Sequence, residues 1–144
     1  MGMENNKLKA FTVLLRASQS IQEVNKKSVA TFGLNQTEFA VLELLYHKGE
    51  QPIQIIGKKI LISSSSITYV VDKLEKKNYI FRRACPDDRR VTYAVMTSEG
   101  KEFMDKNFSQ HQKKIEQIFE QLTDEDITKT IDLLKQIGYH AEKL

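Results

Sequence analysis

Two stretches near the middle of the chain carry side chains suited to binding a polyanion. The first is rich in hydroxyl groups: residues 63–66 are all serine, and Thr68, Tyr69 and Lys73 follow them. The second holds four arginines within a short span, Arg82, Arg83, Arg89 and Arg90. Hydroxyl groups donate hydrogen bonds to phosphate oxygens, and an arginine on a narrow loop can enter the minor groove of DNA. These residue types indicate contact with a nucleic acid rather than bond-making chemistry.

The positive charge of the chain is concentrated in the same region. Residues 53–93 hold nine basic and four acidic side chains, a net charge of +5, so the remaining residues carry −2 of the total of +3. A basic middle between mildly acidic ends is the pattern expected for a polyanionic partner. A charged face that meets only solvent is the alternative, and charge alone does not decide between the two.

Length and composition limit the other possibilities. The chain has 144 residues, 40% of them apolar and 28% charged, which is typical of one globular domain. No apolar stretch approaches the ~20 residues that cross a bilayer, and the first nine residues hold no signal-peptide core, so we expect a cytoplasmic protein without membrane contact. Cys85 is the only cysteine, which excludes an internal disulfide, and the three histidines lack metal-ligand spacing. We expect neither a metal nor a cofactor.

The elements that position these side chains follow from apolar spacing and capping residues. Apolar residues recur at helical period over 8–31, which predicts a long helix that Gly33 ends in a left-handed cap. Asn35 and Glu38 have capping-box spacing and open a second helix. A short third helix is expected from Pro52 to about Ile60, because proline suits a first helical turn.

A fourth helix and a β-hairpin come next. The serine run leads into an apolar stripe at helical spacing, Ile67, Val70, Val71 and Leu74. The serines therefore cap and begin a helix over 63–77 rather than forming a linker, and Asn78 ends it in a left-handed conformation. Two β-branched or aromatic stretches, 79–84 and 91–97, flank a Pro-Asp turn, which predicts a hairpin with a charged tip.

Two further helices complete the predicted order. Thr97 caps a fifth helix that remains apolar through Leu122, and Thr123 with Asp126 forms a capping box that opens a sixth. The sixth helix carries one apolar stripe, Ile127, Ile131, Leu134 and Ile137. We therefore predict a mainly α protein with six helices and a small β-hairpin wing, which is a winged helix-turn-helix.

In this arrangement the fourth helix is the recognition helix, since its apolar stripe is committed to the core. We expect its outward residues to contact DNA, namely Ser64, Ser65, Ser66, Thr68, Tyr69 and Lys73. The serines suit phosphates, whereas Thr68 and Tyr69 sit where side chains reach base edges or thymine methyl groups. The hairpin adds Arg83, Arg89 and Arg90, and Asp88 braces its loop by pairing with an arginine. A polar helix facing solvent and a surface ion-pair network without a ligand are the alternatives.

The sequence from Ile60 to Gly100 resembles the core of the MarR family of multiple-antibiotic-resistance regulators. The matching features are a serine-rich helix start at 64–66, the pair Ile67-Thr68, Leu74-Glu75 before the wing, Asp88-Arg89-Arg90 in the wing, and Met96-Thr97-Ser98-Glu99-Gly100 as its exit. The segment LNQTEFAVLELL, residues 34–45, resembles the second helix of that family. The six-helix order extends the resemblance over essentially the whole chain. Asn78 stands where the family usually has glycine, and Cys85 where it often has aspartate.

This resemblance implies a bacterial transcription regulator that binds double-stranded DNA and has no enzyme activity. Residues 35–97 would form the DNA-binding lobe, and residues 5–32 and 98–144 would form a homodimer. The recognition helix would enter the major groove and the wing the minor groove, with Arg90 as the contact and Asp88 as its brace. Two-fold symmetry then predicts a near-palindromic operator with half-sites ~10 bp apart. Repression is the simpler mode because it requires only occupancy.

Members of this family commonly release DNA when a small aromatic or lipophilic molecule, or an oxidant, changes the spacing of the recognition helices. The residues expected on the helices around such a pocket are Phe11, Leu15, Phe39, Tyr46, His47, Phe108 and His111. Ordinary core packing is the simpler interpretation of each. Cys85 lies beside Pro86 and near Arg83, which makes it a candidate redox site, with an incidental wing residue as the simpler interpretation.

Two other classes of protein remain as alternatives. A winged helix that binds a protein rather than DNA would expose an apolar patch on the recognition face, whereas this face is hydroxylated and basic. An enzyme would need a catalytic constellation, and no Ser/His/Asp or Cys/His arrangement, phosphate-binding glycine loop or metal motif is visible in the sequence.

Overall fold

The computed structural model describes residues 5–60 and 64–144, apart from the side chains of residues 64 and 65. The described residues form six α-helices and one three-stranded antiparallel sheet. In chain order the elements are α1 (Asn6–Ala30), α2 (Gln36–Lys48), β1 (Gln51–Pro52), α3 (Ile53–Lys59), α4 (Ser64–Lys76), β2 (Ile80–Ala84), β3 (Thr92–Met96), α5 (Ser98–Gln117) and α6 (Asp124–Ala141). The predicted fold class, mainly helical with a hairpin wing, is confirmed.

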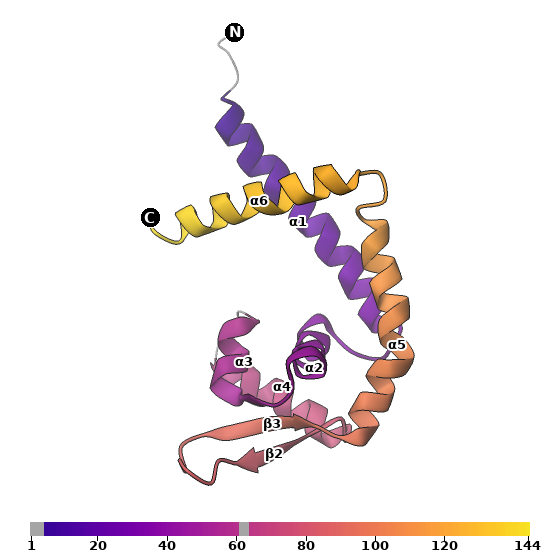
Figure 1. Ribbon diagram of the computed structural model, residues 1–144, viewed down its shortest axis with the longest axis vertical. Coiled ribbons are helices and arrows are strands. Elements are labelled where there is room, and N and C mark those ends of the chain that lie inside the picture. The colour runs from indigo at the N-terminus through magenta and orange to yellow at the C-terminus, as the bar shows by residue number, and fades with distance from the viewer. Residues whose placement is uncertain (1–4, 61–63) are drawn as a thin grey trace.

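The molecule has two regions, which Figure 1 shows. Helices α2, α3 and α4 and the sheet form a lobe at one end, while α1 and α5 extend away from it and α6 follows the far end of α5. The strand order in the sheet is β1-β3-β2. Strands β2 and β3 pair along their whole length, from Ile80 opposite Met96 to Ala84 opposite Thr92, and the hairpin they form is the predicted wing.

The hydrophobic core lies inside the lobe. Its buried side chains are Val29, Leu34, Phe39, Val41, Leu42, Leu45, Ile56, Ile67, Val70, Val71, Leu74, Ile80, Ala94 and Met104. Val29 of α1 and Met104 of α5 belong to this cluster, so one end of each long helix is anchored in the lobe. The recognition helix α4 supplies four of the buried residues and is therefore fixed along one whole face.

Local capping fixes where the helices start and stop. The predicted capping box of α2 is present: the Glu38 backbone N–H donates to Asn35 Oδ1 at 2.8 Å, and the Asn35 backbone N–H donates to Glu38 Oε1 at 2.9 Å. The equivalent box at Thr123 and Asp126 opens α6 as predicted. Gly33 (φ 80°) and Asn78 (φ 65°) both adopt the left-handed conformation, so asparagine replaces the usual glycine after α4 without breaking the pattern.

The structure corrects two details of the predicted elements. Pro52 is the residue before α3 rather than part of its first turn, and with Gln51 it forms the short strand β1 paired to β3. Two residues are too few for an alternating apolar pattern, and proline, which lacks an N–H, is tolerated at the edge of a sheet. Helix α5 ends at Gln117, before Leu122, whereas α3 ends at Lys59, next to its expected end.

Helix α6 does not share in the core. None of its residues is buried, and its apolar stripe is exposed at Ile131, Leu134 and Ile137. Helix α1 likewise exposes Leu8 and Phe11 along the part that extends away from the lobe. Of the helices in the described residues, none has the length and apolarity required to span a membrane.

Candidate nucleic-acid interface

The outward face of α4 is defined by the burial of its opposite face. Ile67 and Leu74 lie in the core, and the exposed side is formed by Ser66, Thr68, Tyr69 and Lys73. The Tyr69 side chain is 60% exposed, and Lys73 Nζ lies 5.3 Å from the centroid of its ring. This cation–π contact holds a positive charge and an aromatic ring together on the face of the helix. Ser64 and Ser65 lie in the first turn of α4, and their side chains fall outside the described residues.

A tight turn shapes the tip of the wing. The Cys85 backbone N–H donates to the Val91 carbonyl at 3.0 Å, and the Val91 N–H donates to the Asp88 carbonyl at 3.1 Å. Asp88 Oδ1 accepts a hydrogen bond from the Arg90 backbone N–H at 3.0 Å and from Arg90 Nε at 3.2 Å. The backbone N–H bond, followed by the side-chain bond, holds the pKa of Asp88 below its usual value.

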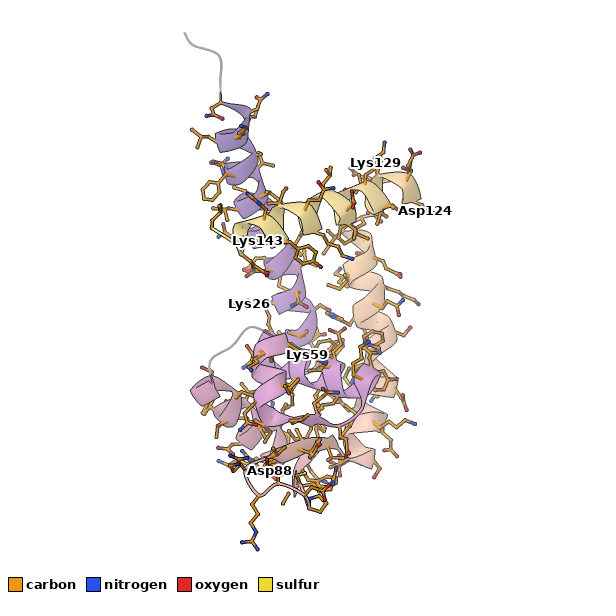
Figure 2. The ribbon with its side chains drawn as sticks, turned by 60° about the vertical axis from the view of Figure 1, so that its left-hand side comes forward. Lys26, Lys59, Asp88, Asp124, Lys129 and Lys143 are labelled. Carbon is orange, nitrogen blue, oxygen red and sulfur yellow. The ribbon has the colours of Figure 1, made fainter. Side chains whose placement is uncertain are left out.

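Arg90 is bound to Asp88 through its backbone N–H and its Nε, while its side chain remains exposed to solvent. The Arg90 side chain is 90% exposed even though its Nε contacts Asp88. Arg89 beside it is also exposed. Figure 2 labels Asp88 on the wing, at the end of the molecule opposite Lys129 on α6. The exposed guanidinium of Arg90 is therefore presented at the extremity of the lobe, where a second molecule can approach it.

The two arginines of β2 are paired with carboxylates of the same chain. Arg83 Nη2 lies 2.6 Å from Glu50 Oε1, and its guanidinium lies 4.9 Å from the centroid of the Tyr93 ring. Arg82 pairs with two carboxylates of α4, Asp72 and Glu75. Sequence reasoning missed these acidic partners. Their signal was present, since Asp72 and Glu75 are spaced i, i+3 on the helix that precedes the strand.

A cleft joins the recognition helix to the wing. It has a volume of about 240 Å³ and is lined by Ile53, Gln54, Ile67, Thr68, Arg90 and Thr92. Thr68 from α4 and Arg90 from the wing thus face one hollow, although they lie far apart in the sequence. Its lining combines two isoleucine side chains with hydroxyl, amide and guanidinium groups, which donate hydrogen bonds to phosphate and sugar oxygens.

The residues expected around a ligand pocket fall into separate groups. Tyr46, His47 and Phe108 form one cluster, with ring centroids 4.9–5.8 Å apart. Phe39 and His111 form a second, with centroids 4.4 Å apart. The remaining two, Phe11 and Leu15, are exposed on α1 and belong to neither cluster.

Both clusters lie where the lobe meets α5. The Tyr46 hydroxyl donates to Asp105 Oδ1 at 2.5 Å, and this bond raises the pKa of Tyr46. His111 is buried, its Nδ1 lies 2.9 Å from Ser28 Oγ, and its burial lowers its pKa. Cys85 is half-buried beside the wing turn. Across residues 5–60 and 64–144, no three His, Cys, Asp or Glu side chains gather as metal ligands.

A helical pair followed by a recognition helix and a β-hairpin defines a winged helix-turn-helix, a class of DNA-binding domain. Residues 34–92 match the model of the MarR family. The chain is 48% identical over 141 residues to the HTH-type transcriptional regulator MhqR of Bacillus subtilis (strain 168), covering 98% of this chain and 97% of that protein.

Solved structures agree in fold. AbsC, a MarR family transcriptional regulator from Streptomyces coelicolor, has a TM-score of 0.90 at 23% identity, covering 100% of this chain and 99% of that one. Sco3205, a MarR family regulator from the same organism solved in complex with DNA, has a TM-score of 0.87 at 19% identity, covering 96% and 89%. The chain belongs to the MarR family: it is a DNA-binding transcription regulator, and the family is not one of enzymes.

Proposed function

We propose that this regulator binds a near-palindromic operator as a homodimer, with α4 in the major groove and the wing in the adjacent minor groove. The observation that carries this proposal is the cleft shared by Thr68 and Arg90. A helix that reads base edges and a loop that follows the DNA backbone must bind the same duplex together, and a residue of each lines this cleft.

The DNA contacts are assigned by exposure and by existing partners. Ser66, Thr68, Tyr69 and Lys73 face outward on α4, and Arg89 and Arg90 do so on the wing. Arg83 contributes only if DNA draws it away from Glu50, because that carboxylate already holds its guanidinium at 2.6 Å. Ser64 and Ser65 remain predicted phosphate contacts at the start of the helix.

The proposal of a homodimer is supported by the apolar surface that a single chain leaves exposed. A groove with a volume of about 490 Å³ runs along α6, lined by Glu116, Phe119, Glu120, Leu122, Asp124, Ile127, Thr130, Ile131 and Leu134. Exposed apolar side chains also follow the free part of α1. Monomeric proteins rarely leave contiguous apolar areas of this kind in water. A second copy that covers them places residues 5–32 and 98–144 in the dimer and leaves residues 35–97 as the DNA-binding lobe.

The release of DNA is assigned to the contact between the DNA-binding lobe and the dimer helices. The cluster of Tyr46, His47 and Phe108 spans α2 and α5, so a planar apolar molecule inserted there would alter the angle between the lobe and the dimer helices. A repressor that lets go of its operator on binding such a molecule is the mode this arrangement favours. Cys85 is a weaker candidate for signal detection because it is half-buried against the wing turn.

The test is fluorescence anisotropy on DNA from upstream of the gene that encodes this chain, against scrambled DNA, over a salt series. Tight binding to the first, with two chains per site and affinity falling steeply with salt, supports the proposal. If neither DNA is bound at low salt, the proposal fails and a protein-binding winged helix replaces it. That alternative is disfavoured by the recognition face, where the exposed aromatic Tyr69 lies against the charge of Lys73.

A further inference from the structure

Arg82 joins the wing to the recognition helix through its side chain. Its Nη2 lies 2.6 Å from Asp72 Oδ1 and its Nη1 lies 2.5 Å from Glu75 Oε1. Both carboxylates belong to α4, whereas Arg82 lies in β2, the first strand of the wing. One guanidinium therefore bridges two carboxylates on the helix, a geometry that the planar fork of arginine allows and the point charge of lysine does not.

The backbone at the same position makes a third connection. The Arg82 N–H donates to Glu75 Oε2 at 3.2 Å. Strand β2 is an outer strand of the sheet, so its outward N–H groups have no neighbouring strand to pair with. Glu75 accepts a hydrogen bond from one of these N–H groups, that of Arg82, and also from the Arg82 side chain. The wing is thus attached to α4 by three hydrogen bonds at a single residue.

The Arg82 guanidinium is turned toward two carboxylates of α4 at the surface of the lobe. The Arg82 side chain is only 29% exposed, and its positive charge faces two negative ones. Arg90, on the same hairpin, is directed into solvent. Because ion pairs at a surface contribute little to the free energy of unfolding, stability alone does not account for two carboxylates committed to one guanidinium.

We propose that Arg82 is a positioning residue that fixes the angle between the recognition helix and the wing, so that both engage one operator half-site. This inference rests on the proposed function. Beyond Arg82 the hairpin continues through Arg83 and Ala84 to Cys85, whose N–H still pairs with the Val91 carbonyl. That length is ~10 Å at the usual strand rise, so a rotation of ~10° would move the tip by ~2 Å. A displacement of that size exceeds the tolerance of a hydrogen-bonded contact.

The test uses three variants of the full chain, each measured on operator DNA and on scrambled DNA over a salt series. Arg82→Gln removes the bridge from the wing. The double variant Asp72→Asn with Glu75→Gln removes it from the helix with nearly identical shapes and leaves Arg82 in place. Arg90→Gln is the matched control, because it has the same change of charge on the same hairpin. Circular dichroism melting verifies that each variant is folded.

The double variant separates positioning from charge. Removing two negative charges beside the DNA face should tighten binding if only electrostatics matter. Positioning predicts the opposite for the operator: affinity about tenfold weaker than that of the wild type, with binding to scrambled DNA equal or tighter. Arg82→Gln should also bind the operator about tenfold more weakly while keeping the wild-type salt slope, whereas Arg90→Gln should lose ~1.8 from the slope of the dimer.

Two results would overturn the inference. Operator binding by the double variant at wild-type strength or better would show that the bridge does not position the wing. A salt slope reduced by ~1.8 in Arg82→Gln would show that Arg82 contacts phosphate directly. Failure of the proposed function looks different, since the wild-type protein itself would then not distinguish the operator from scrambled DNA.

Discussion

Replacement of Arg90 by glutamine is expected to weaken operator binding about a hundredfold while leaving the fold intact. The Arg90 side chain is 90% exposed and its ion pair with Asp88 lies at the surface, so little stability depends on it. A hydrogen bond to a charged group contributes about 1.5 kcal/mol. A dimer loses two such contacts, about 3 kcal/mol, which is roughly a hundredfold in the dissociation constant.

The salt dependence gives a second magnitude for the same variant. Each phosphate neutralised by a cation adds ~0.9 to the slope of log affinity against log salt, so the dimer should lose ~1.8. Between 50 and 200 mM salt the gap between wild type and variant would then narrow about tenfold. Both quantities come from one anisotropy titration series on operator DNA.

The matched control for this prediction is Lys129→Gln. Lys129 has a side chain that is 69% exposed and lies on α6, at the end of the molecule opposite the wing (Figure 2). Lys129→Gln removes the same charge far from the proposed DNA interface, and Lys129 is not among the residues that line the α6 groove assigned to the dimer. It should therefore leave affinity and slope unchanged. Equal losses in the two variants would refute the reasoning, because the wing would then contribute only to net charge.

Three further predictions concern the scaffold. Gly100→Ala should lower the melting temperature by about 3–9 °C, from about 1–3 kcal/mol of overpacking, because a Cβ there would lie 2.2 Å from the Tyr79 carbonyl oxygen. Burial lowers the pKa of His111 in the folded protein, so as the pH falls below 6.5 the unfolded chain binds the proton first. The free energy of unfolding of the wild type should then fall by up to ~1.4 kcal/mol per pH unit, and His111→Gln should remove this fall. Leu134→Glu, at a side chain 45% exposed on α6, should raise the dissociation constant of the dimer at least about a hundredfold in sedimentation.

Each of these has an outcome that contradicts it. An unchanged melting temperature for Gly100→Ala, measured at equal protein concentration, would mean that α5 can move away from Tyr79. A pH dependence identical to that of the wild type in His111→Gln would mean that another group causes it. A dimer of undiminished strength in Leu134→Glu would place the interface elsewhere than on the α6 stripe.

Features of the site that depend on local sequence could be predicted. The apolar spacing of Ile67, Val70 and Leu74 identified the buried face of α4 and therefore its outward face. Asn78 could be placed in a left-handed turn, and Asp88 and Arg90 are two residues apart, so their contact needs no tertiary arrangement. In each case the residues that interact are neighbours along the chain.

Features that depend on how elements pack could not be predicted in the same way. The ion pair between Arg83 and Glu50 could not be predicted, because the two residues lie 33 positions apart in the sequence and Glu50 belongs to the segment before β1. That strand is two residues long and exists only because β3 provides its hydrogen bonds. Phe39 and His111 likewise meet across α2 and α5. The Arg83–Glu50 pair, strand β1 and the Phe39–His111 contact all depend on packing between distant parts of the chain, which the periodicity of the sequence does not reveal.

The most direct test of the account is a hydroxyl-radical footprint of the wild-type protein on its operator, since this reagent attacks the sugars that line the minor groove. Two wings related by a two-fold axis should protect two patches placed symmetrically about the operator centre, flanking half-sites ~10 bp apart. Arg90→Gln should weaken both patches equally. A single asymmetric patch, or protection confined to the centre of the site, would contradict a homodimer that places its wings in the minor groove.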